Sequence, residues 1–193
     1  MPLSSPVPRE HIHTRQVECR GYRRGDGLWD IDGHITDVKT YGFGSRERGE
    51  VEAGMPIHDM WIRLTIDDKL SIQAVEAVTD SSPYRICPNV TPNFQRLIGL
   101  SIGPGFGKQV RERLGGVEGC THLVELLGPV GTTAFQTVMP MIEREKSERK
   151  KIQPQGELPA RKRPALLDTC YAFSSSGEVA KRQWPEFYRP KEG

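Results

Sequence analysis

The stretch "GCTHLVELL", residues 119–127, places a thiol, an imidazole and a carboxylate together where a helix is expected to begin. Thr121 alone would be an ordinary helix cap, since its hydroxyl can accept a hydrogen bond from a backbone N–H. Cys120 and His122 flank it, and Glu125 follows the histidine by three residues, within reach of its ring on a helix. Three interpretations stay open: a metal ligand held in orientation, a catalytic nucleophile or acid/base pair, and an ordinary helix surface.

The segments before this helix are expected to form a three-stranded antiparallel meander. Residues 29–35 alternate apolar and polar side chains, with Trp29, Ile31 and Ile35 on one face, and period two indicates a strand. Residues 58–67 and 70–80 alternate in the same way around a tight "DDK" turn, which predicts a hairpin. We interpret residues 1–20 as an irregular arm.

Helices are expected to follow and to cover one face of this sheet. The sequence predicts short helices over residues 93–100 and 105–116, and a longer helix from Cys120 whose apolar residues recur every three or four positions. Gly128 and Pro129 inside it indicate a kink or two helices in series. The fold class is therefore α+β.

The remainder of the chain divides by composition. The core domain is predicted over residues 21–148, and a basic, proline-containing linker over 149–163. Residues 164–193 are expected to be a cover segment that packs back on the core, because its apolar side chains would otherwise be exposed. The "SSSG" tetrapeptide in this segment predicts a hairpin turn between two short strands.

Composition excludes several classes of protein. The 193 residues are 36% apolar and 27% charged, with a net charge of +2 and a mean hydropathy of −0.54. No apolar run approaches the roughly 20 residues that span a bilayer, so we expect no membrane partner. The small net charge gives no indication of a nucleic-acid partner, and we expect none. Four cysteines without a CxxC pair, and no apolar leader, favour a cytoplasmic protein. A small molecule is the partner that we expect. The sequence indicates no oligomeric state.

Three stretches resemble the iron–sulfur scaffold proteins of the IscU/NifU (SufE/NifU-like) type, over roughly residues 53–140. "GMPIHDMWIRLTIDD" has the family's turn, alternating strand and hairpin, with His58 in place of the first ligand cysteine and Asp59 in place of its aspartate. "PYRICP" places Cys87 where the second ligand cysteine is expected, and "CTHLVELL" carries the histidine and cysteine of the final helix in reversed order.

The resemblance implies one ligand set at one end of the sheet. His58, Cys87, Cys120 and His122 would converge there, and Asp59 would orient a ligating histidine. Thiolate and imidazole together favour zinc or iron, whereas an iron–sulfur cluster is expected to need more thiolates than this chain supplies. Most of the chain also resembles an uncharacterised bacterial family known only as a domain of unknown function.

Two classes of function follow. The first is a small metal-binding protein with its site at the end of the sheet. The alternative is an enzyme of lyase or isomerase type, in which Cys120 or the pair of His122 and Glu125 acts on a small organic acid or aromatic in the same pocket. Arg63 or Arg85 would then bind a carboxylate of that substrate.

Overall fold

The computed structural model describes residues 3–152, 163–164 and 166–191 of the chain. They belong to two compact units, Met1–Arg149 and Lys150–Gly193, each of which is described by itself. No helix among the described residues is both long enough and apolar enough to cross a membrane.

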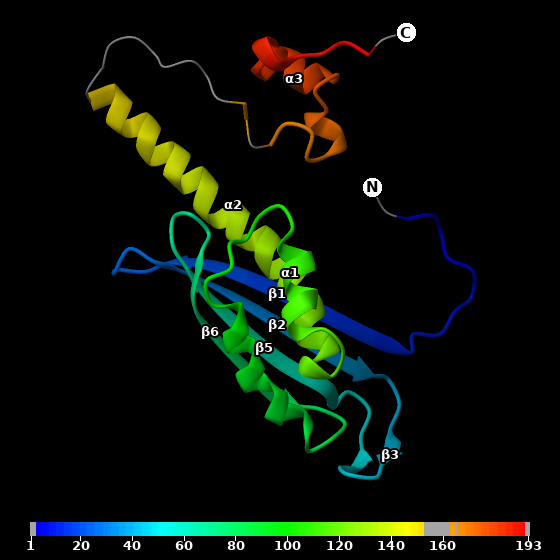
Figure 1. Ribbon diagram of the computed structural model, residues 1–193. Coiled ribbons are helices and arrows are strands. Elements are labelled where there is room, and N and C mark those ends of the chain that lie inside the picture. The colour runs from blue at the N-terminus through cyan, green and yellow to red at the C-terminus, as the bar shows by residue number, and fades with distance from the viewer. Residues whose placement is uncertain (1–2, 153–162, 165, 192–193) are drawn as a thin grey trace. The chain divides into compact units, whose positions relative to one another are not determined.

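The first unit is built on a four-stranded antiparallel sheet with the order β1-β2-β5-β6 (Figure 1). A small separate hairpin, β3 with β4, interrupts the chain between β2 and β5. The strands are β1 (His13–Arg23), β2 (Trp29–Lys39), β3 (Phe43–Ser45), β4 (Gly49–Val51), β5 (Pro56–Ile66) and β6 (Ile72–Ser81).

The sheet therefore has one strand more than the three-stranded meander predicted from the sequence. The expectation of an irregular arm is wrong for residues 13–20, which form most of β1 and pair with β2 over its full length. Most side chains of β1 are exposed, so the strand lacks the apolar alternation that would have revealed it. The α+β class is confirmed, whereas nothing in this architecture specifically supports a scaffold-type assignment.

Helices cover one face of the sheet, as Figure 1 shows for α1 and α2. The apolar face of α2 packs on strands whose inward side chains are also apolar, and these residues form one buried cluster. Gly33 of β2 permits the close approach, because a Cβ there would lie 2.5 Å from Val130 of the helix. The helical elements are η1 (Cys87–Leu97), α1 (Phe106–Leu114), η2 (Gly116–Glu118) and α2 (Thr121–Ile152).

Two details of the predicted helices change. The short helix expected over residues 93–100 is a 3-10 helix that starts earlier, at Cys87, so the cysteine lies at its first turn. The region with Gly128 and Pro129 belongs to one assigned helix, α2, rather than to two helices in series.

The second unit contains no strand among its described residues, so the predicted hairpin at "SSSG" is wrong. Its elements are η3 (Tyr171–Phe173), α3 (Glu178–Gln183) and η4 (Pro185–Phe187), and the ring of Phe173 packs against Trp184 at a centroid distance of 5.6 Å. The predicted linker over 149–163 lies largely outside the described residues. The role of residues 164–193 as a cover stays a prediction.

Candidate active site

Three polar side chains form a row across the inner face of the sheet, which is the face that the helices cover. The row lies at one end of the buried apolar side chains on that face. Arg15 of β1 lies directly opposite Asp37 of β2, and Asp37 lies opposite His58 of β5. The alternation of β2 that buries Ile31 and Ile35 also turns Asp37 inward. The alternation of β5 does the same for His58, which lies two residues before the buried Met60. A β-bulge follows Asp37, and bulges are common beside active sites because they redirect side chains.

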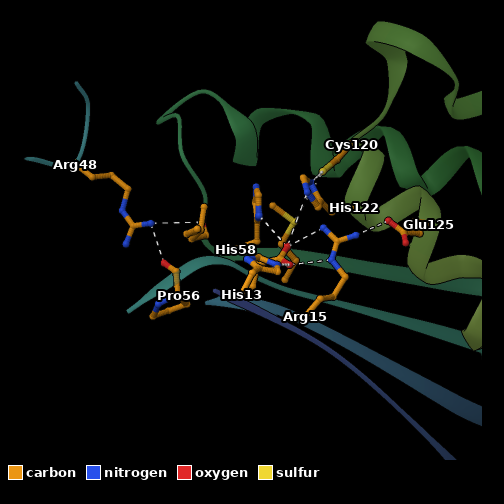
Figure 2. A network of polar contacts seen from close by, with 11 residues as sticks. His13, Arg15, Arg48, Pro56, His58, Cys120, His122 and Glu125 are labelled. Atoms are coloured by element: carbon orange, nitrogen blue, oxygen red, sulfur yellow. Dashed lines mark hydrogen bonds and ion pairs between the residues drawn. The ribbon is translucent and has the colours of Figure 1, made fainter. Parts of the chain in front are cut away.

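Asp37 is the centre of this row and is buried, with 1% of its surface exposed. Its Oδ1 accepts hydrogen bonds from Arg15 Nε at 2.8 Å and His13 Nε2 at 2.9 Å. Its Oδ2 accepts from Arg15 Nη2 at 2.9 Å and His58 Nδ1 at 3.0 Å. Figure 2 shows His13, Arg15 and His58 gathered at this point beneath the start of α2.

The surroundings of Asp37 keep its carboxylate ionised. Burial alone would raise the pKa of this group, but the hydrogen bonds from Arg15 and His13, the charge of Arg15 and the bond from His58 lower it to about 2. An ionised carboxylate accepts hydrogen bonds and cannot donate them, so the bonded Nδ1 of His58 must carry a proton. In the neutral ring, Nε2 is then the unprotonated nitrogen.

The rings of His58 and His122 lie against each other. Their ring centroids lie 3.7 Å apart with a tilt of 33°. Burial lowers the pKa of His58, and the neighbouring His122 adds to this effect, while the bond to Asp37 opposes it. Burial also lowers the pKa of His122, followed by the positive charge of Arg15. Both rings therefore favour the neutral form, which is the form that accepts a proton or binds a metal.

The start of α2 brings Cys120 and His122 to this row, as Figure 2 shows. The thiol Sγ of Cys120 lies 3.9 Å from His122 Nδ1 and 3.8 Å from the sulfur of Met60. Nε2 of His122 lies 4.0 Å from Asp37 Oδ2, which is an ionic contact but longer than a hydrogen bond. Glu125 accepts a hydrogen bond from Arg15 Nη1 at 2.8 Å, whereas the sequence suggested His122 as its partner.

The two histidines line a cavity of about 650 Å³, a volume typical of small-molecule sites. Its wall comes from β5, from η1 and the segment that leads into it, from η2, and from the start of α2. Cys87 and Cys120 also line it, so the four residues His58, Cys87, Cys120 and His122 do meet at one cavity. The remaining lining residues are Met60, Pro83, Tyr84, Ile86, Asn89, Val90, Asn93, Val117, Gly119 and Thr121.

Three of the sequence-predicted residues lie elsewhere. Asp59 and Arg63 are on the outer face of the sheet, because both differ from His58 by an odd number of positions. Asp59 accepts a hydrogen bond from His34 at 2.7 Å, and Arg63 forms two with Asp32 at 2.6 and 2.7 Å. Arg85 bonds the side chain and backbone of Glu47 and does not line the cavity.

A metal-binding group is also present in this row. Atoms of Asp37, His58 and His122 that can ligate a metal all lie within 4.8 Å of one another. Carboxylate and imidazole together suit zinc and iron. Among the described residues this group differs from the predicted set, since it contains Asp37 and neither cysteine.

Sequence reasoning missed Asp37, Arg15 and His13. Asp37 carries a usable signal, because its position has the same parity as the buried Ile31 and Ile35, which predicts an inward carboxylate. Arg15 and His13 carry no such signal, since they reach Asp37 only through the pairing of β1 with β2.

Comparisons with known proteins place the chain without giving it an activity. Searches of curated proteins and of solved structures gave no match. Residues 13–136, well over half of the chain and including the site, match a family described as "Protein of unknown function (DUF2889)". The chain belongs to the DUF2889 family.

Proposed function

We propose that this chain is an enzyme that moves a proton on a small organic molecule, with His58 as its general base. The observation that supports this is the hydrogen bond from His58 Nδ1 to the buried, ionised Asp37, on a ring that lines the cavity. A buried carboxylate that holds one imidazole nitrogen fixes the tautomer and stabilises the imidazolium that forms when the other nitrogen takes a proton.

The proposed step uses the neighbouring residues in distinct ways. Nε2 of His58 takes a proton from a C–H or O–H of the ligand, which leaves the electron pair on the ligand. Arg15 keeps Asp37 ionised and in place, and Glu125 holds the far side of the Arg15 guanidinium. In an isomerase the His58 imidazolium returns the proton to another atom of the ligand, and in a lyase it gives the proton to the departing group. Either step leaves His58 neutral again and needs no second acid.

A small carbon acid tests the base without presupposing the natural substrate. Nitroethane exchanges its acidic carbon-bound protons for deuterium in heavy water when a base removes them, and NMR follows the loss of signal. A positioned general base typically contributes about 10²–10⁴-fold. We expect the His58→Gln substitution to lower the protein-catalysed exchange rate by about 10²-fold or more.

The chain offers a matched control for this substitution. His34 is bonded to Asp59 on the outer face of the same strands, so the His34→Gln substitution removes an equivalent pair away from the cavity. The exchange rate of that variant should equal the wild-type rate. An equal loss in both variants, or no loss in His58→Gln, would contradict the assignment of the base.

Metal binding is the second candidate function, favoured by the close group of Asp37, His58 and His122. In this candidate the three side chains bind zinc or iron, and Cys120 adds a thiolate ligand. The acid–base proposal accounts better for Asp37, because an ionised carboxylate has about four acceptor positions and four donors already use them. An ion would have to displace one of those donors.

Metal content after dialysis against zinc separates the two candidates. A metal site predicts about one zinc per chain in the wild type and its loss in His122→Ala, with the His34→Ala variant unchanged. Zinc bound in equal amounts by all three proteins, or by none, would remove this second candidate.

A further inference from the structure

The cavity wall carries no formal charge of its own. None of the described lining residues is Asp, Glu, Lys or Arg, and the polar groups are two amides, two hydroxyls, two thiols and the two imidazoles. Asp37 lies behind the wall and is balanced by Arg15. The larger part of the wall is apolar, through Met60, Pro83, Tyr84, Ile86, Val90 and Val117.

The arginines near the cavity are already engaged. The guanidinium of Arg15 donates to Asp37 and Glu125, that of Arg48 donates to two backbone carbonyls, and that of Arg85 donates to the backbone carbonyl of Glu47. A carboxylate entering the cavity would give up its water and would meet no unengaged guanidinium in the wall. Removing an anion from water without a partner is costly.

The edge of the cavity exposes apolar side chains to solvent. Tyr84 is 59% exposed, Ile86 71% and Val117 93%. These three residues come from two separate segments and all line the same cavity. Large exposed apolar groups gathered around a cavity are typical of a site that binds an apolar body.

The polar groups in the wall favour a ligand that donates a hydrogen bond. Nε2 of His58 is an acceptor in the neutral tautomer fixed by Asp37. The amide Nδ2 of Asn93 donates to the backbone carbonyl of Glu118, so Oδ1 is the acceptor that this side chain can offer to a ligand.

From these observations we propose that the site takes an uncharged aromatic compound with a hydroxyl or another acidic proton, rather than an organic acid. The ring packs against the apolar wall and edge, and its O–H donates to His58. This inference rests on the proposed role of His58 as the base, and it narrows the ligand of that same site.

One feature opposes the proposal. The start of α2 lines the cavity at Gly119, Cys120 and Thr121, and the first N–H groups of a helix attract anions. The affinities of two ligands that share a ring and differ in charge show which effect is larger, the attraction of the helix start for an anion or the lack of a cation to pair with it.

Binding of naphthol and naphthoate at neutral pH is the test. Both have the same ring system, and only naphthoate is ionised. We expect naphthol to bind about tenfold tighter or more in calorimetric titrations, with NMR shifts at the rings of His58 and His122. Naphthoate binding as tightly as naphthol, or naphthol shifts that avoid both histidines, would overturn the proposal.

Two variants locate the binding. Val117→Asp adds a charge at the edge of the cavity and should weaken naphthol binding about tenfold. Val7→Asp makes the same change at another exposed valine, away from the lining residues, and should leave it unchanged. If both substitutions weaken naphthol binding equally, the result contradicts the proposal that naphthol binds against the apolar wall of the cavity.

The nitroethane assay keeps this inference separate from the proposed function, because nitroethane has no ring. Exchange that depends on His58 without naphthol binding would overturn the ligand class alone. Naphthol bound at the two histidines without such exchange would support the ligand class and overturn the base.

Discussion

The same two strands carry an aspartate–histidine pair on each face of the sheet. On the inner face, Asp37 of β2 bonds His58 of β5 at 3.0 Å, and on the outer face His34 of β2 bonds Asp59 of β5 at 2.7 Å. The two pairs use the same residue types on neighbouring strands. By hydrogen-bond length alone, the outer pair would be taken for the stronger one.

Their surroundings separate them. The side chain of Asp37 is 2% exposed and that of His58 14%, whereas His34 and Asp59 are 22% and 28% exposed. The inner carboxylate is held by Arg15 and His13, and the inner imidazole packs at a tilt against a second histidine. The outer imidazole stacks on Trp61 at 3.6 Å.

This difference shows what turns a common polar contact into a candidate site. Burial makes the interaction of the inner pair strong, the arginine keeps its carboxylate ionised, and a cavity brings a ligand to its imidazole. The outer pair is a solvent-screened contact with a stacked tryptophan. The inner and outer pairs are therefore matched partners for experiments.

The largest difference is expected when each carboxylate is replaced by an amide. Asp37→Asn removes the charge that pairs with Arg15 and leaves several donors with one neutral partner, which should lower the free energy of unfolding by about 2–3 kcal/mol. Asp59→Asn acts on the more exposed outer pair and should cost less than about 1 kcal/mol. Urea unfolding of both variants measures the two changes in the free energy of unfolding. Equal losses of stability would contradict the distinction between the inner and the outer pair.

The dependence of stability on pH should reveal the inner pair next. The pKa of Asp37 is lowered from 3.8 to about 2 in the folded protein, so its stabilising effect is complete above 3.8 and is lost as pH falls toward 2. At about 1.4 kcal/mol per pKa unit, this loss is about 2 kcal/mol. Unfolding followed across this range should show the loss in Asp59→Asn and should show it diminished in Asp37→Asn.

The histidines add a second loss of stability, which begins at a higher pH than the loss caused by Asp37. Folding lowers the pKa of His58 and His122 from 6.5, so the unfolded chain binds protons first as the medium is acidified. Stability should therefore begin to fall below pH 6.5. The His58→Gln variant should lose part of this step and His34→Gln should keep all of it. A step unchanged in His58→Gln would contradict the lowered pKa.

The smallest effect is expected at Cys120. Its thiol touches His122 and Met60, but the proposed proton transfer needs only the imidazole of His58. Cys120→Ala should change the nitroethane exchange rate by less than about threefold, since the thiol then acts as a small apolar group. Loss of exchange in this variant would instead support Cys120 as a reacting group, as the sequence suggested.

The sequence predicts the central part of the fold because its strands alternate regularly. Residues 58–67 bury every second side chain from Met60 to Ile66, and the apolar stripe of the long helix is buried from Leu123 to Val138. The first strand could not be predicted in this way, because most of its side chains are exposed and show no period.

The sequence predicts the imidazoles and thiols of the site but not its carboxylate and arginine. The resemblance and the helix start predict the convergence of His58, Cys120 and His122, whereas the predicted carboxylate, Asp59, has the parity that turns it outward. Asp37 has the correct parity, and its role depends on Arg15, which lies 22 positions earlier in the chain. A contact of that kind is fixed by strand register and leaves no local pattern.

The most direct test of the central claim is an NMR measurement of the histidine ring nitrogens across pH. It reports, for His58 and His34 separately, which nitrogen carries the proton and at what pH the second proton binds. The account predicts that His58 is protonated mainly at Nδ1 alone at neutral pH and that this neutral form still predominates at pH 6.5, with Asp37→Asn removing the tautomer preference. A doubly protonated His58 at that pH, or a proton on Nε2 alone, would contradict it.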